Sequence, residues 1–366
     1  MLSCAGTPSL EPTAEVHITD ARTVGSGETR PGGTPPHPLL EVRPISGEGG
    51  RIITFANQKG GVGKTTTSVN LATGLALRGH RVLVVDVDPQ SNATTGLGLD
   101  HRQLARSTYE LMVDGASFDS VVRTTSIKGL DCVPSSPDLA GAEVELVGEM
   151  AREGKLAEAL KQAHRRYEVV FLDCPPSLGL LTVNALAAAH DLIVPVQCEY
   201  YALEGLGQLL GTAERVHRTV NPALRIAGFV MTMFDARTRL SSQVADEVRS
   251  HFGSFVFDTI VPRSVRISEA PSFGEPVLTL DPSSRGAISH RLLAAEFEAR
   301  YGLDTHVPAP PPAGDAERSE RTNVNLREPV AQLAAPGPGP RGYGVTTGEP
   351  PGLDTAWPPR APWSAP

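Results

Sequence analysis

A glycine-rich loop between an apolar run and a helical run constrains the fold of this chain more than any other feature. The loop, Lys59 to Thr67, reads KGGVGKTTT; it follows the apolar run RIITFA at 51–56 and precedes a segment with the apolar spacing of a helix. Glycines adopt positive φ readily, so backbone N–H groups can point into one concavity, and the N-terminus of the helix adds partial positive charge. The sequence therefore predicts a phosphate-binding loop where a strand turns into a helix.

Lysine and threonine side chains give this loop its chemistry. Lys64 is placed to contact terminal phosphates, and the Thr65 hydroxyl is placed to bind Mg²⁺. The spacing departs from the general pattern G-x-x-x-x-G-K-[ST], because Gln58 holds the position of the first glycine; a second lysine, Lys59, stands at the mouth of the loop. A plain glycine turn and an ordinary solvated lysine are the alternative interpretations. The expected nucleotide contacts are Lys59, Gly60, Gly61, Val62, Gly63, Lys64, Thr65 and Thr66.

Composition divides the 366 residues into one domain, 51–302, and two tails. Residues 1–50 and 303–366 are rich in proline and lack a sustained apolar period, so they cannot bury enough apolar surface to offset the entropy of ordering. We expect both tails to be disordered. They are either tethers for a partner or, more simply, solubilising appendages.

Within the domain, short apolar runs alternate with amphipathic segments, which predicts an α/β fold: a doubly wound, mostly parallel sheet with helices on both faces. In such folds ligands bind at the carboxyl ends of the strands. The expected strands are 52–56, 82–87, 130–134, 169–172, 192–196, 226–233 and 256–261. The expected helices are 66–77, 156–166, 180–189, 204–220, 242–252 and 287–300.

Apolar runs, cysteines and net charge indicate where the protein is located and how it could bind nucleic acid. The sequence shows no basic start followed by an apolar run, so we expect no signal peptide. Since no stretch approaches eighteen consecutive apolar residues, we also expect no membrane-spanning helix. Because Cys4, Cys132, Cys174 and Cys198 show no paired spacing, we expect a cytoplasmic protein with reduced thiols. The net charge of −8 means that any contact with nucleic acid must come from a local basic patch.

Three aspartates follow predicted strands at the edge where the loop lies. Asp86 and Asp88 close the second strand, and Asp173 ends the fourth after the apolar run VVFL. We expect Asp173 to hold Mg²⁺ through a coordinated water, because Mg²⁺ keeps several of its waters, and Asp88 to lie near the metal. The alternative for Asp86 and Asp88 is that they only cap a strand end before a turn.

Four separated motifs together resemble the ParA/Soj chromosome-partitioning ATPases, of the deviant Walker A class that also holds MinD-type proteins and the nitrogenase iron protein. The resemblance runs from about residue 51 to 301. It implies ATP and Mg²⁺ as cofactors and slow basal ATP hydrolysis. The motifs are KGGVGKTTT, VVDVDPQSNAT at 84–94, FLDCPPSLG at 171–179 and PVQCEYYALEGL at 195–206.

The resemblance also implies roles for single residues. Asp88 orients the attacking water with Asp86 as its support, and Lys59 reaches the phosphates of the other protomer in an ATP-dependent sandwich homodimer. Met233 and Pro262 fall where the nucleotide base is held. The further partners implied are non-specific DNA and a ParB-type centromere-binding protein, in a protein associated with the nucleoid.

Arg237 and Arg266 match the positions that the family uses for DNA, and loop arginines of this kind would bind phosphates without regard to sequence. The alternative is an ion pair with Asp235, Glu269 or another neighbouring carboxylate.

Alternatives to a partitioning ATPase remain. A MinD-like membrane ATPase needs a basic amphipathic helix at the C-terminus, where this chain has a proline-rich tail. An iron protein needs cysteines that share an iron–sulfur cluster between subunits, a pattern absent here. The interpretation as a nucleotide-gated binding regulator with negligible turnover remains open, because the presence of Asp88 and Asp173 does not determine the rate of ATP hydrolysis.

Overall fold

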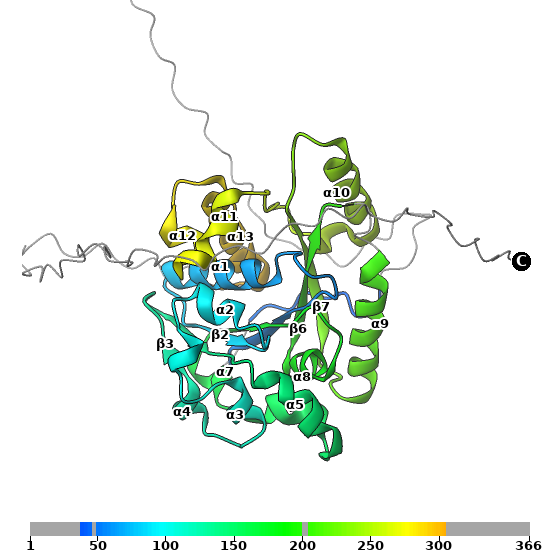
Figure 1. Cartoon of the computed structure of the whole chain (residues 1–366). Helices are drawn as coiled ribbons and strands as arrows, with labels where there is room; N and C mark the ends of the chain where they lie inside the picture. Colours follow the sequence, from blue (N-terminus) through cyan, green and yellow to red (C-terminus); the bar gives the residue numbers. More distant parts are fainter. Residues whose placement is uncertain (1–36, 46–48, 200–203, 305–366) are drawn as a thin grey trace, which may run out of the picture. The chain divides into compact units, whose positions relative to one another are not determined.

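The computed structural model describes residues 37–45, 49–199 and 204–304, and within them a parallel sheet forms the centre of the fold (Figure 1). Its seven strands run in the order β3-β4-β2-β5-β1-β6-β7. Every neighbouring pair is parallel except β3 with β4. This confirms the doubly wound, mostly parallel sheet. The strands are β1 Arg51–Phe55, β2 Val82–Asp86, β3 Arg123–Thr124, β4 Leu130–Val133, β5 Val169–Asp173, β6 Asp191–Gln197 and β7 Arg225–Thr232.

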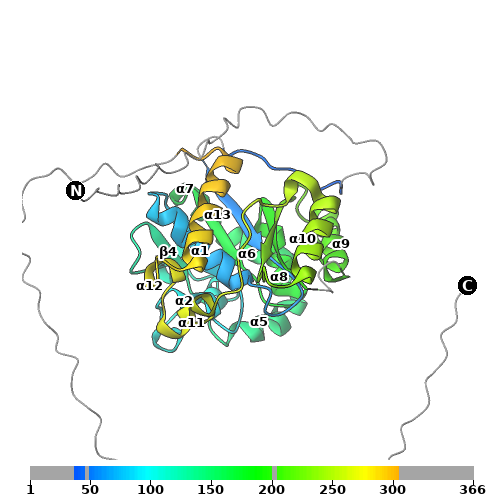
Figure 2. The ribbon, with the colours of Figure 1, turned by 90° about the horizontal axis from the view of Figure 1, so that it is seen from above.

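Helices cover both faces of the sheet (Figure 2). One buried apolar layer joins the sheet to α1, α12 and α13, and a second joins it to α5, α6, α8 and α9. None of the helices in the described ranges combines the length and apolar character needed to cross a bilayer. The helices are α1 Lys64–Leu77, α2 Asn92–Gly96, α3 Thr108–Met112, α4 Phe118–Val121, α5 Leu139–Glu145, α6 Lys155–Ala159, α7 Ala163–Arg166, α8 Leu180–Ala188, α9 Glu204–Thr219, α10 Arg239–Phe252, α11 Val265–Glu269, α12 Val277–Leu280 and α13 Arg285–Tyr301.

The strand expected at 256–261 does not form. The amides of Phe257 and Val261 donate to β7, as a strand would. Between them, the amides of Asp258 and Thr259 donate instead to the two carboxylate oxygens of Glu296, at 2.7 and 2.8 Å. A side chain from α13 therefore takes the donors that a continuous ladder would need, and only isolated bridges remain.

The helix expected at 156–166 is two short helices, α6 and α7. At the break, the amides of Lys161 and Ala163 donate three residues back, to Glu158 and Leu160, which tightens the chain into turns. The short helices α2 to α5, α11 and α12 were not expected, because segments of four to seven residues are too short to show a helical period.

Residues 37–45, placed in the N-terminal tail by composition, pack on the domain as a strap along the edge of β7. Leu39 is 2% exposed, and Leu40 forms a parallel bridge with Ile226. Farther along, the amide of Ile45 donates to the carbonyl of Tyr301 at 2.8 Å. The packed region therefore begins before residue 51. The other tail residues, 1–36 and 305–366, lie outside the described ranges, so their expected disorder stays a prediction.

The strap generates a test of stability. Leu39→Ala should lower the free energy of unfolding by about 2 kcal/mol, the low end for a core Leu→Ala change, because the strap can detach before the domain unfolds. Urea denaturation measures the difference. The matched control is Leu292→Ala, at a side chain that is 57% exposed, which should change stability by less than about 0.5 kcal/mol. If Leu39→Ala lowered the free energy of unfolding no more than Leu292→Ala does, packing of the strap would not stabilise the domain.

Candidate functional site

The glycine-rich loop connects the end of β1 to the start of α1, as expected. Gly61 and Gly63 have φ of 72° and 87°, in the left-handed region that favours glycine. The Thr232 hydroxyl, at the end of β7, donates to the carbonyl of Val62 at 2.7 Å and fixes the loop from the neighbouring strand. No side chain caps the N-terminus of α1 at Gly63. The first amides of this 14-residue helix are thus left to bind an anion.

Lys64 is a buried cation at the base of the loop. It is 6% exposed, and its Nζ donates to the carbonyl of Lys59 at 3.3 Å. Among the residues that the structure describes it forms no ion pair within 4.0 Å. Burial lowers the pKa of Lys64, and the nearby Asp173, Cys174 and Asp88 oppose that shift. A phosphate in the loop would supply the close anionic partner that this ammonium lacks.

Asp173 provides an oxygen suited to a hydrated cation. It is fully buried; its Oδ1 accepts from the Ser68 hydroxyl at 3.0 Å, whereas its Oδ2 has no hydrogen-bond partner. Burial raises the pKa of Asp173, only partly opposed by hydroxyl hydrogen bonds and Lys64. The described ranges hold no cluster of three His, Cys, Asp or Glu ligands. The residues fit Mg²⁺ held by the Thr65 hydroxyl, water on Asp173 and phosphate oxygens, because Mg²⁺ needs few protein ligands.

The two aspartates after β2 have different surroundings. Asp86 accepts from the amide and the hydroxyl of Thr94 at 2.8 and 2.7 Å, and from the amide of Asp88 at 3.1 Å. Burial, then the charge of Asp173, raises the pKa of Asp86. Asp88 accepts from the amide of Gln90 at 2.9 Å and lines the cavity beside the loop. Asp86 therefore holds the backbone, and Asp88 is the carboxylate available to a bound molecule.

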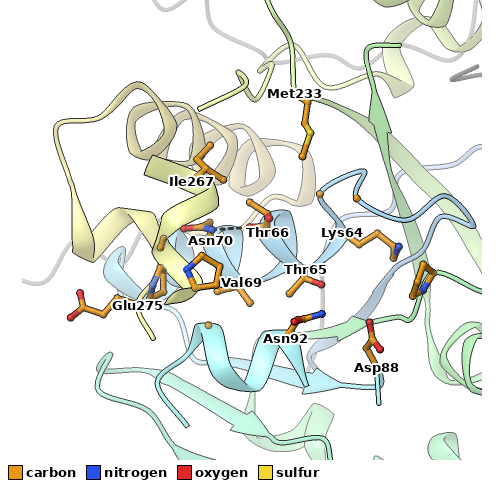
Figure 3. A pocket seen from close by; sticks show the side chains of 17 residues that line it. Lys64, Thr65, Thr66, Val69, Asn70, Asp88, Asn92, Met233, Ile267 and Glu275 are labelled. Carbon is orange, nitrogen blue, oxygen red and sulfur yellow. Dashed lines mark hydrogen bonds between the residues drawn. The ribbon is translucent and has the colours of Figure 1, made fainter. Parts of the chain in front are cut away.

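A cavity of about 300 Å³ runs from the loop along α1 (Figure 3). Asn70 lines it from α1: its side chain accepts from the amide of Val277 at 2.9 Å and so ties α12 to α1. Seven of the expected site residues line the cavity: Gly61, Gly63, Lys64, Thr65, Thr66, Asp88 and Met233. Five do not: Lys59, Gly60, Val62, Asp173 and Pro262.

Ten further residues line this cavity, none of them among the site residues expected from the sequence. Asn92 and Gly96 belong to α2, just after the aspartates, and Pro176 follows Asp173. Figure 3 shows Asn92 beside Thr65 and near Asp88. The prolines of the irregular segment after α11 were the available signal for the outer wall. The other seven residues are Val69, Asn70, Ile267, Ala270, Pro271, Glu275 and Pro276.

Met233 and Pro262 meet beside the main cavity. Both line a hollow of about 130 Å³ that shares Gly63 and Thr66 with it. Met233 has φ of 51°, a costly backbone conformation for a residue that is not glycine. A bridge between Phe234 and Pro262 holds the two segments together. Their assignment to a nucleotide base stays a prediction, now with a hollow that could receive one.

Lys59 does not point into the cavity. Its Nζ lies 3.0 Å from Glu199 Oε2 in the same protomer, with the two side chains 41% and 47% exposed. Its carbonyl accepts from Lys64, and its amide donates to Asn57. The side chain is thus neither free in solvent nor bound at its own phosphate site.

The two arginines expected to bind DNA are paired with carboxylates. Arg237 Nε and Nη2 donate to Asp235 at 2.9 and 2.7 Å, from a side chain that is 87% exposed. Arg266 lies 3.2 Å from Glu269 and 3.4 Å from Asp281. The ion pairs considered as the alternative are therefore present. Exposed pairs of this kind are weak, so both arginines remain candidates.

Comparison with known proteins places this geometry in a family. A family model described as an AAA domain matches residues 50–226. The chain is 51% identical to sporulation initiation inhibitor protein Soj of Bacillus subtilis over 250 residues, 68% of this chain and 99% of the relative. It is 49% identical to chromosome partitioning protein ParA of Myxococcus xanthus over 251 residues, 69% of this chain and 89% of the relative.

A solved structure shares the fold of this chain. It is cobyrinic acid a,c-diamide synthase from Mycobacterium smegmatis with bound ATP analogue and magnesium, which is 37% identical, with a TM-score of 0.62 over 71% of this chain and 98% of that one. The match to Soj covers 99% of the Soj chain, so common descent accounts for both the sequence motifs and the geometry of the loop. This chain belongs to the ParA/Soj family of chromosome-partitioning proteins.

Proposed function

We propose that this protein is an ATP-hydrolysing switch that dimerises on ATP, binds DNA without sequence preference and is reset by a ParB-type partner. The observation that carries the ATPase assignment is the set of groups beside the phosphate loop: the buried Lys64 without an ion pair in the described residues, the Asp173 Oδ2 without a hydrogen-bond partner among those residues, and Asp88, which lines the cavity. Relatives named as partitioning proteins support the cellular role.

In this proposal each residue acts by position and charge. The loop amides and Lys64 hold the phosphates, while Thr65 and Asp173 hold hydrated Mg²⁺, which neutralises phosphate charge when bound. Asp88, at the opposite side of the cavity mouth, orients the attacking water. Phosphoryl transfer depends mainly on alignment of the reactants and neutralisation of their charge. The Asp88 carboxylate would supply the alignment, and Lys64 and bound Mg²⁺ would supply the positive charge.

Lys59 supplies the proposed dependence of dimerisation on ATP. A half-exposed lysine at the loop mouth can leave Glu199 and reach phosphates bound by a second copy, where its charge stabilises the transition state as an arginine finger does. The ion pair with Glu199 would hold Lys59 in place before the second copy arrives. Because exposed pairs contribute about 0–1 kcal/mol, a triphosphate can outcompete it.

DNA contact through Arg237 and Arg266 is proposed for the dimer. Both side chains are more than half exposed, and each must exchange its carboxylate partner for a DNA phosphate. Two copies double the number of such contacts, so weak single-copy binding becomes useful affinity on dimerisation. Hydrolysis, stimulated by a ParB-type partner, would separate the copies and release them from the nucleoid. A gated regulator without turnover remains the second candidate, since nothing in the geometry sets a rate.

Hydrolysis is tested at two side chains. Lys64→Ala should abolish ATP binding, dimerisation and turnover together, whereas Asp88→Ala should keep ATP and the dimer but hydrolyse ATP about a hundredfold more slowly. Phosphate release and nucleotide binding measure the two effects. Asp100→Ala, at an exposed aspartate outside the cavity, is the matched control. Normal hydrolysis by Asp88→Ala would remove this aspartate from the mechanism, and no hydrolysis by the wild type under any condition would favour the gated regulator.

Dimerisation is tested at the Lys59–Glu199 pair. Lys59→Ala should bind ATP normally but stay monomeric in sedimentation velocity, because it lacks the cation that reaches the other copy. Glu199→Gln should dimerise at lower protein concentration than the wild type, because Lys59 no longer has to leave a carboxylate. Lys161→Ala, at a lysine that is 66% exposed, is the control. An ATP-bound dimer of Lys59→Ala would disprove the role.

DNA binding is tested at Arg266. Arg266→Glu should dimerise with ATP yet bind DNA at least about tenfold more weakly, to the same extent for any sequence, and with a flatter dependence on salt. Fluorescence anisotropy on unrelated duplexes measures this. The control Arg102→Glu makes the same change of charge at an exposed arginine outside α11. If both variants lose the same affinity, the effect is one of net charge and the assignment of Arg266 is wrong.

A further inference from the structure

A buried serine of α1 contacts the carboxylate that we expect to hold hydrated Mg²⁺. Ser68 is 0% exposed, and its hydroxyl oxygen lies 3.0 Å from Asp173 Oδ1. The same hydroxyl lies 3.0 Å from the carbonyl oxygen of Thr65, three residues back in the helix. A serine inside a helix often bonds only to such a carbonyl. The second contact, with a strand residue 105 positions away, therefore needs its own explanation.

Two oxygens compete for the single hydrogen of the Ser68 hydroxyl. The Thr65 carbonyl is neutral, whereas an ionised Asp173 carboxylate is the stronger acceptor. Burial raises the pKa of Asp173, and hydrogen bonds from the hydroxyls of Thr65 and Ser68 oppose that rise. The Thr65 hydroxyl is itself expected to bind Mg²⁺. In a loaded site, Ser68 is thus the hydroxyl that stays on Asp173.

The bond joins the two elements that supply the protein groups of the expected metal site. Thr65 lies in the first turn of α1, and Asp173 ends β5. Because residues three apart in a helix are neighbours on its surface, Ser68 and Thr65 lie side by side on α1. A hydrogen bond from Ser68 to Asp173 therefore sets where the carboxylate of β5 lies relative to the Thr65 hydroxyl.

The bond also determines which oxygen of Asp173 stays available. Oδ1 is held by Ser68, while Oδ2 is buried and has no hydrogen-bond partner among the residues that the structure describes. The terminal torsion of an aspartate side chain is soft, so a carboxylate without this bond could turn freely. With Oδ1 fixed, the free oxygen keeps one direction.

We propose that Ser68 is a positioning residue for the metal site: its hydroxyl holds Asp173 so that Oδ2 can accept a hydrogen bond from a water on bound Mg²⁺. The inference rests on the proposed function and adds to it a residue that does not line the cavity. Residues that orient metal-binding groups from behind change metal affinity by about 10- to 100-fold when they are mutated. Because Asp173 acts through water, we expect the low end of that range.

The test measures how strongly Mg²⁺ raises the affinity of the full chain for a fluorescent ADP, which requires no hydrolysis. Titrations in excess Mg²⁺ and in EDTA give the ratio of the two dissociation constants. Ser68→Ala should reduce this ratio about tenfold and leave the affinity in EDTA unchanged, because the phosphate loop is intact. Ser68→Thr keeps a hydroxyl and should restore most of the ratio.

The matched control is Ser289→Ala. Ser289 is a buried serine of α13, and its hydroxyl donates to a carbonyl of its own helix at 2.9 Å. This variant makes the same truncation away from the phosphate loop, so it should keep the ratio of the wild type. Urea denaturation without ligand verifies that each variant is folded.

Three results would overturn the inference. They are an unchanged ratio in Ser68→Ala, an equal reduction in Ser289→Ala, and a folded Ser68→Thr that responds to Mg²⁺ no better than Ser68→Ala. Equal losses of affinity in Mg²⁺ and in EDTA would also contradict it, because Ser68 would then support the loop and not Asp173. A wild type that binds ADP with Mg²⁺ but never hydrolyses ATP would contradict the ATPase proposal alone.

Discussion

The parallel register of β2, β5 and β1 is the constraint on which the site depends. Asp173 at the end of β5 lies opposite Phe55 of β1 on one side and Asp86 of β2 on the other. The glycine-rich loop, the aspartate pair after β2 and the Asp173 carboxylate therefore leave the sheet at one level. A shift by a single residue would turn Asp173 to the other face, away from Lys64.

This arrangement concentrates buried charge that the protein alone leaves poorly compensated. Asp86 is satisfied by three hydrogen bonds. Among the described residues, however, Asp173 has one oxygen without a hydrogen-bond partner, and the Lys64 ammonium donates to a carbonyl alone. Burial of such groups costs free energy unless they are paired. A bound metal and phosphate would supply the missing partners, so the imbalance that weakens the free protein is a source of ligand affinity.

The sequence was sufficient for those parts of the fold that local pattern determines. The loop, the aspartates after their strands and six of seven expected strands follow from apolar period and glycine spacing. The missing strand depended on Glu296, which takes backbone donors from 38 and 37 residues away. The strap at 37–45 was hidden because one buried leucine in a proline-rich segment gives no period. The Lys59–Glu199 pair is a tertiary contact that no local signal specifies. The prolines at 271 and 276 mark an irregular segment, but they do not place it against α1 as a cavity wall.

The segment after Asp173 links the charge chemistry to the surface. Pro176 lines the cavity, and a Cβ added to Gly60 of the phosphate loop would lie 3.9 Å from the Pro176 side chain. At the other end, a Cβ added to Gly179 would meet the carboxylate of Glu143, so that flexible side chain would have to shift to admit one. Consecutive prolines restrict the backbone between these points. At a connection restricted in this way, we expect a change at the phosphates to reach α8.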